Sequence, residues 1–117
     1  MRVLVCGSLA WNDRAAIEQE LRGLPADSVI LEGEAPGADI MARQIAEELG
    51  LEVWPYPKDQ RLGKGADRSR DQQMFYEGQP TLVLIFHEDI ENSRGSKEQR
   101  QRAMKRQVAY KVIGSNG

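Results

Sequence analysis

The chain has 117 residues, of which 40% are hydrophobic and 29% are charged, and its net charge is −2. This length predicts one domain over residues 1–117 with the composition of an ordinary globule. The acidic balance argues against bulk nucleic-acid binding, which needs a strongly positive field. Because no run approaches ~18 apolar residues and the N-terminus lacks a signal-peptide pattern, we expect a cytoplasmic protein with no membrane partner.

The cysteine and histidine content limits the chemistry. Cys6 is the only cysteine and His87 the only histidine, so an intramolecular disulfide is excluded and no metal site is predicted. Cys6 ends a predicted buried strand and is expected to be a small hydrophobe. His87 follows another strand and has no obvious partner to fix it. The sequence therefore predicts no catalytic nucleophile and no cofactor.

Strands and helices are predicted to alternate along the chain. Short apolar runs bounded by polar residues or glycine are typical of buried parallel strands, and they occur at residues 3–6, 29–31, 51–54, 81–86 and 110–113. Apolar residues spaced one turn apart predict helices at about residues 13–22, 39–49, 70–76 and 96–107. The remaining long segments are a polar loop at 57–70 and a tail at 114–117.

This alternation predicts a Rossmann-like α/β three-layer sandwich with a mostly parallel five-stranded sheet. The pattern Ser96-Lys97-Glu98-Gln99 matches a capping box, so the last helix is expected to begin at Ser96. In such sheets, ligands bind beyond the carboxyl ends of the strands. The loops after the first, second and fourth strands, together with the long loop after the third strand, are therefore the candidate site.

The first of these loops contains Gly7, Ser8 and Trp11. Gly7 lets the backbone turn and lets a ligand approach closely. The Ser8 hydroxyl and nearby amides are suited to a phosphate oxygen, and Trp11 is suited to stacking on a base. The alternative is an ordinary strand-to-helix turn with Trp11 in the core.

The second loop, residues 32–39, places two glycines before a helix. This arrangement predicts free backbone amides at the positive end of the helix, which suit an anionic group. It is neither a Walker A loop nor the G-x-G-x-x-G fingerprint. Asp39 is suited to accept a hydrogen bond from a ribose hydroxyl, to hold the neighbouring loop, or only to cap the helix. The candidate ligand-binding residues here are Gly33, Glu34, Ala35, Gly37, Ala38 and Asp39.

The third loop contains Arg94, Gly95 and Ser96. Arg94 is suited to bind phosphate through paired N–H groups, and the alternative is an ordinary loop before a capped helix. Arg70 opens the third helix beside Asp71. It is expected to pair with Asp71, to reach the site or to reach a neighbouring subunit.

These segments, in this order, resemble the SLOG superfamily, and within it the short stand-alone YspA-like group. The matching stretches are residues 7–11, 32–39, 70–74 and 92–96, so the resemblance covers almost the whole chain. It implies a Rossmann-like domain with a pocket for a nucleotide or a nucleotide-derived ligand, including ADP-ribose-like or cyclic nucleotide signals. It also implies a homo-oligomer, for which Met74, Phe75 and Tyr76 are suited to either core or interface.

Several positions depart from the family pattern. Hydrolase relatives carry a catalytic glutamate where this chain has Gln99, which cannot ionise and so cannot act as an acid or base. Added carboxylates should weaken the binding of highly charged anions unless they hydrogen-bond sugar or base. The departing residues are Leu9, Glu32, Glu34, Asp71, Asn92, Ser93 and Gln99.

The preferred interpretation is a ligand-binding module that senses, carries or sequesters a nucleotide-derived small molecule; whether it is also an enzyme stays open. One alternative is a nucleoside-monophosphate N-glycosidase with Glu98 or Asp39 as its acid. The other is single-stranded nucleic-acid binding through the basic residues 94–106 with Trp11 or Trp54 as stacking platforms. The acidic total charge disfavours that last alternative, and residues 94–106 are expected to be mainly a solvated helix face.

Overall fold

The computed structural model describes residues 1–114, so the predicted tail lies outside the described residues from position 115 onward. Five parallel strands form one sheet in the order β3-β2-β1-β4-β5. The strands are β1 (Arg2–Gly7), β2 (Val29–Glu32), β3 (Glu52–Pro55), β4 (Leu82–Phe86) and β5 (Ala109–Ile113). The helices are α1 (Arg14–Arg22), α2 (Ala38–Glu48), α3 (Ala66–Gly78) and α4 (Arg94–Lys105), with 3₁₀ turns η1 (Gln60–Gly65) and η2 (Ile90–Asn92).

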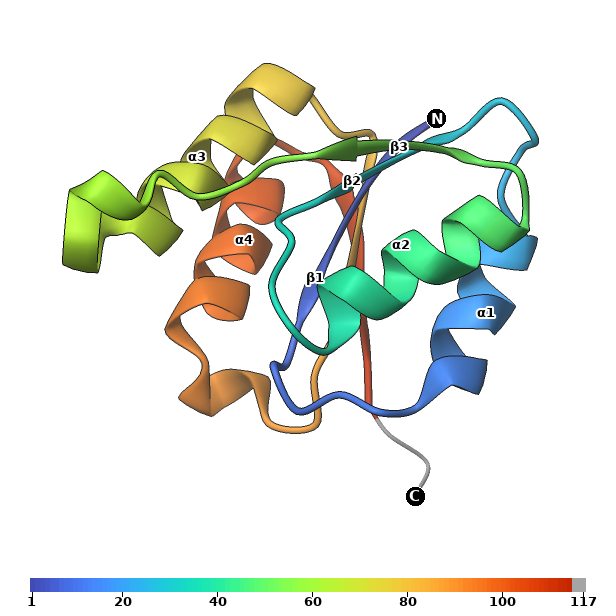
Figure 1. Cartoon of the computed structure of the whole chain (residues 1–117), viewed down its shortest axis with the longest axis horizontal. Helices are drawn as coiled ribbons and strands as arrows, with labels where there is room; N and C mark the ends of the chain where they lie inside the picture. The colour runs from blue at the N-terminus through green and yellow to red at the C-terminus, as the bar shows by residue number, and fades with distance from the viewer. Residues whose placement is uncertain (115–117) are drawn as a thin grey trace.

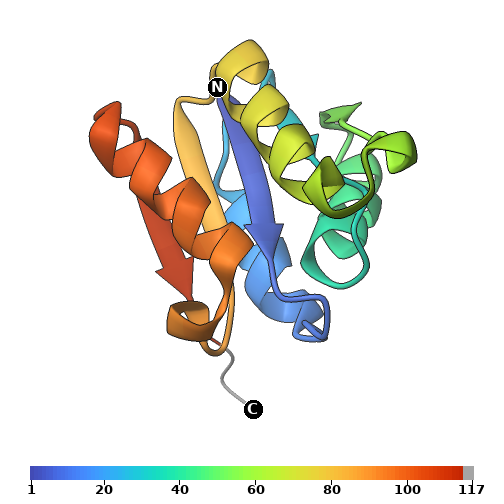
Figure 2. The same cartoon turned by 90° about the vertical axis from the view of Figure 1, so that its left-hand side faces the viewer.

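The helices cover both faces of the sheet, which confirms the predicted three-layer sandwich. Helices α1 and α2 pack on one face, and α3 and α4 lie side by side on the other (Figures 1 and 2). The chain moves outward from β1 through β2 to β3 and then returns to β4 on the other side of β1. Strand order therefore reverses at the β1/β4 pair, and the carboxyl ends of these two strands mark the expected ligand-binding edge. Of the helices within residues 1–114, none combines the length and apolarity needed to span a membrane.

Alternation along the strands divides the core into two layers. In β1, Val3 and Val5 face α1 and α2, whereas Leu4 faces α3 and α4. Both layers are fully buried at these positions, as expected for a parallel sheet covered on both faces. The α3 side also buries Met74 and Phe75 in the core, whereas the neighbouring Tyr76 is 45% exposed.

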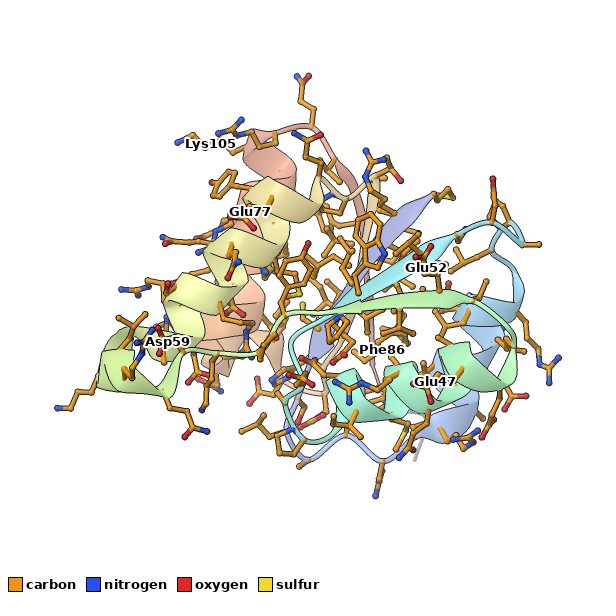
Figure 3. All side chains as sticks on the ribbon, turned by 45° about the horizontal axis from the view of Figure 1, so that its top comes forward. Glu47, Glu52, Asp59, Glu77, Phe86 and Lys105 are labelled. Carbon is orange, nitrogen blue, oxygen red and sulfur yellow. The ribbon has the colours of Figure 1, made fainter. Side chains whose placement is uncertain are left out.

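Trp11 packs in the core. Its side chain is only 3% exposed, and its ring lies 5.7 Å from that of Phe86, which is labelled in Figure 3. The indole Nε1 donates to the Asp13 carbonyl oxygen at 2.9 Å, which satisfies its polar atom. The prediction that Trp11 stacks on a base is therefore wrong, because apolar burial and this hydrogen bond already engage the ring.

Two helix starts differ from the sequence-based prediction. The 57–70 segment, predicted to be a loop, is helical from Gln60 onward. Asp59 caps η1 by accepting from the Arg61 amide at 3.1 Å, and α3 follows directly from Ala66. Helix α4 begins at Arg94 instead of Ser96. Ser93 is its N-cap and accepts the Ser96 amide at 3.3 Å, so the predicted capping box at Ser96 is wrong.

The loop after β1 and the start of α2 are joined at Gly37. This residue has φ 82° and ψ −123°, and the following Ala38 amide donates to the Ser8 carbonyl oxygen at 3.2 Å. A Cβ atom at position 37 would overlap that same Ser8 oxygen. Glycine is thus required here both by the backbone conformation and by the close approach of the two loops.

Gly37→Ala should destabilise the fold by about 3 kcal/mol or more, because it combines backbone strain with steric overlap. Gly50→Ala is the matched control: Gly50 also has a positive φ, 76°, but open space surrounds its Cβ position. That control should cost only about 1–2 kcal/mol. Urea unfolding of both variants measures the difference, and equal costs would contradict the steric requirement for glycine at position 37.

Candidate ligand-binding site

A cavity of about 610 Å³ lies at the carboxyl ends of β1 and β2 and beside the first turn of α4. This volume is within the range of small-molecule sites. Most of the predicted site residues line it, namely Gly7, Gly33, Glu34, Ala35, Asp39, Arg70, Arg94, Gly95 and Ser96. The others stand outside its wall, namely Ser8, Trp11, Gly37 and Ala38.

Ser8 lies beside the cavity but directs its hydroxyl to other protein groups. Its Oγ donates to Glu88 Oε1 at 2.8 Å and accepts the Ala10 amide at 3.1 Å. The same bond from Ser8 helps to hold the pKa of Glu88 below its usual value. The Ser8 hydroxyl, which the sequence suggests for a phosphate oxygen, is thus engaged in bonds that shape the loop after β1.

Three amides of the loop after β2 already have protein acceptors. Asp39 Oδ2 accepts the Gly33 amide at 3.0 Å and the Ala35 amide at 3.4 Å. The Glu34 amide donates to Glu32 Oε2 at 2.6 Å. The prediction of free amides therefore fails for these three positions, whereas the Gly37 and Asp39 amides have no protein acceptor within residues 1–114.

The Asp39 side chain is buried, and its environment changes its titration. Burial raises the pKa of this carboxyl to about 7, although the Gly33 amide and the Arg70 charge oppose the increase. Of the roles considered for Asp39, the structure shows that it holds the neighbouring loop. Near neutral pH this side chain exchanges between its protonated and ionised forms.

Arg70 links α3 to the loop after β2 across the cavity floor. Only 8% of it is exposed, and its guanidinium contacts Asp71 at 2.8 Å, Asp67 at 3.3 Å and the Gly33 carbonyl oxygen. A Cβ atom on Gly33 would lie 2.8 Å from the guanidinium, so the missing side chain makes room for it. Of the expected roles, Arg70 both pairs with Asp71 and reaches the site, and two carboxylates balance its charge.

The start of α4 combines unpaired amides with an arginine side chain, whereas carboxylates surround the start of α2. Ser93 engages the Ser96 and Lys97 amides, but the Arg94 and Gly95 amides meet no protein acceptor within residues 1–114. The Arg94 side chain is 51% exposed, and its one ion pair within the described residues is with Glu98 at 3.1 Å. Because the helix dipole places partial positive charge here, this end of the cavity suits an anion.

The residues considered for catalysis are mostly engaged elsewhere. Gln99 is buried; its Nε2 donates to the Asp71 carbonyl oxygen at 3.2 Å and its Oε1 accepts from Arg102 at 2.8 Å. Burial raises the pKa of the Cys6 thiol well above its ordinary value, so this cysteine is a poor nucleophile. His87, outside the cavity wall, accepts the Asp89 amide on Nδ1.

The long loop before α3 was expected near the site, but its individual wall residues were not predicted. Lys58, Gln60 and Asp67 line the cavity there. A usable signal existed in the spacing of Ala66, Arg70 and Met74, which are one turn apart and all buried. The charge of Arg70 hid this helical period, because a buried arginine breaks the apolar pattern.

The titration of Asp39 predicts a specific pH dependence. Since the pKa of Asp39 is raised in the folded protein, the folded state binds more protons than the unfolded state between about pH 4 and 7. Stability should therefore fall as pH rises through this window and level off above it. The difference in unfolding free energy between wild type and Asp39→Asn should fall by at most about 1.4 kcal/mol per pH unit there. Urea titrations across this range measure it, and a pH-independent difference would refute the assignment.

Comparisons with known proteins agree with this architecture. The YspA, cpYpsA-related SLOG family model matches residues 1–63. The X-ray structure of DNA processing protein A from Streptococcus pneumoniae matches 99% of this chain with a TM-score of 0.76 at 21% identity. The chain spans about half the length of that protein, and at this identity the likeness shows the fold alone. No curated protein matches the sequence. Because the family model covers more than half of the sequence, the chain belongs to the YspA, cpYpsA-related SLOG family.

Proposed function

We propose that the protein binds a phosphate-bearing, nucleotide-derived small molecule in this cavity and acts as its sensor, carrier or sequestering protein. Family membership implies ligands of the nucleotide type in general. The observation that carries the proposal is the start of α4, where two unpaired amides and Arg94 border a cavity of about 610 Å³.

The phosphate is assigned to Arg94, Gly95 and Ser96. The Arg94 and Gly95 amides supply two donors at a positive helix end, and the Arg94 guanidinium supplies charge. Each charge-assisted hydrogen bond to such a group typically contributes about 1.5–3 kcal/mol. The Arg94–Glu98 pair does not prevent this role, because an exposed ion pair at this spacing is weak and opens readily.

The rest of the wall suits a nucleoside. Leu9, Pro36 and Ile40 provide an apolar side, and Leu9 is 67% exposed without a ligand. Glu34, Asp67 and other carboxylates provide acceptors for sugar hydroxyls or base amino groups. We therefore assign the base to the apolar side and the sugar to the acidic part. The proposal also includes a homo-oligomer, with the exposed Tyr76 as one candidate contact.

A thermal-shift screen against nucleotides, ADP-ribose species and cyclic dinucleotides tests this function. At one hundred times its Kd, a ligand adds about 2.7 kcal/mol of stability, which raises Tm by roughly 10 °C for a domain of this size. Arg94→Ala should remove most of the shift at the same ligand concentration while changing the Tm of the free protein little. Lys105→Ala, an exposed charge change at the far end of α4, should keep the shift. No shift with any of these compounds would refute the proposal.

A second candidate function is hydrolysis of a nucleoside monophosphate at its N-glycosidic bond. Asp39 favours it, because this carboxyl lines the cavity and a pKa of about 7 lets it carry a proton at neutral pH. Glu98 is poorly suited to be the acid, because Arg68 and Arg94 hold its pKa below the usual value despite its partial burial. Incubation with nucleoside monophosphates should then release free base, and Asp39→Asn should abolish the release. Absence of free base would remove this candidate.

A further inference from the structure

A second cleft of about 270 Å³ adjoins the main cavity, and Arg94 lines both. The other residues of this cleft come from the end of η1 and the first two turns of α3, and they are Lys64, Gly65, Arg68, Ser69 and Gln72. Figures 1 and 2 show α3 and α4 side by side with their N-terminal turns at the same end of the molecule. A ligand held at the start of α4 would therefore extend directly into this second cleft.

The second cleft carries an excess of positive charge. Arg68 Nε and Arg94 Nη1 contact the same Glu98 oxygen, at 2.9 Å and 3.1 Å, so one carboxylate serves two guanidinium groups. Lys64, the third cation, has no acidic partner within residues 1–114. Two positive charges thus remain unbalanced around a small concave surface, which favours an anionic occupant.

The main cavity has the opposite balance. Its wall contains the carboxylates of Glu34, Asp39, Asp67 and Asp71 beside only three cationic side chains, of which Arg70 is already paired with two acids. A ligand with several phosphates would be repelled if all of them lay within this cavity. Additional phosphate charge is best placed beyond Arg94, where the carboxylates are fewer.

We propose that the second cleft holds a second phosphate of the ligand, so that the protein selects nucleotides with a diphosphate over those with a single phosphate. The inference rests on the proposed function, because it places the first phosphate at the Arg94 and Gly95 amides. Arg94 lies between the two phosphates and contacts both through its planar fork of N–H groups. Lys64 and Arg68 hold the second phosphate, and Ser69 and Gln72 add neutral donors.

The test compares the binding of matched nucleotides by calorimetry. The probes are the 5′-monophosphates and 5′-diphosphates of the four common ribonucleosides, together with inorganic phosphate and pyrophosphate. The variant is Lys64→Gln/Arg68→Gln, which changes the second cleft and leaves Arg94 in place. The matched control is Arg22→Gln/Lys105→Gln, which removes the same charge from an exposed site on α1 and from the far end of α4, where Figure 3 labels Lys105.

In the wild type, a diphosphate should bind about tenfold or more tightly than the monophosphate of the same nucleoside. In the second-cleft variant this ratio should fall to within about twofold, while monophosphate affinity stays nearly unchanged. The control variant should keep the wild-type ratio. Raising the salt concentration should reduce the ratio in the wild type, since it screens the charges that create it.

The outcomes separate this inference from the proposed function. Monophosphate binding with no diphosphate preference, or with a preference that the second-cleft variant retains, would overturn the inference alone. In another outcome, pyrophosphate binds more tightly than phosphate in a way that depends on Lys64 and Arg68, but none of the nucleotides binds. That result would overturn the proposed function and support an anion site in the second cleft. Failure of every probe to bind would overturn both.

Discussion

The ligand-binding edge depends on the Asp39 carboxylate. By accepting the Gly33 and Ala35 amides it closes the loop after β2, and the Gly33 carbonyl oxygen of that closed loop receives the Arg70 guanidinium. The loop after β2, α2 and α3 are thus connected by one buried network. Burial of the Asp39 carboxylate carries a desolvation cost, which raises the pKa of this group. The surrounding donors offset only part of that cost.

This network also decides where an external anion is able to bind. At the start of α2 the Glu34 and Asp39 carboxylates disfavour a phosphate, whereas at the start of α4 the Arg94 and Gly95 amides lie beside the Arg94 guanidinium. The same division gives the cavity two unlike ends. Acidic and apolar groups lie on the side of α2, and positive charge gathers where Arg94, Arg68 and Lys64 meet. A nucleotide matches this polarity when its phosphates point toward α4.

The architecture was predictable because each strand is a short apolar run with a clear end, and parallel strands bring their carboxyl ends to one edge. That rule also placed the three loops correctly around the cavity. The errors arose where several side chains compete for one role. The sequence allowed Trp11 either to pack in the core or to stack on a base, and it allowed either Ser93 or Ser96 to cap α4. Such choices depend on contacts between elements, which the local pattern does not contain.

The central claim is that phosphate binds at the start of α4 and not at the start of α2. Its most direct test is an amide-resolved NMR titration with whichever nucleoside monophosphate stabilises the protein most. The Arg94 and Gly95 amide signals should show the largest downfield proton shifts, as these amides gain an anionic acceptor, while Gly33 and Ala35 change little because Asp39 already holds them. Largest shifts at the amides that begin α2, those of Gly37 and Asp39, with Arg94 and Gly95 unmoved, would contradict the claim.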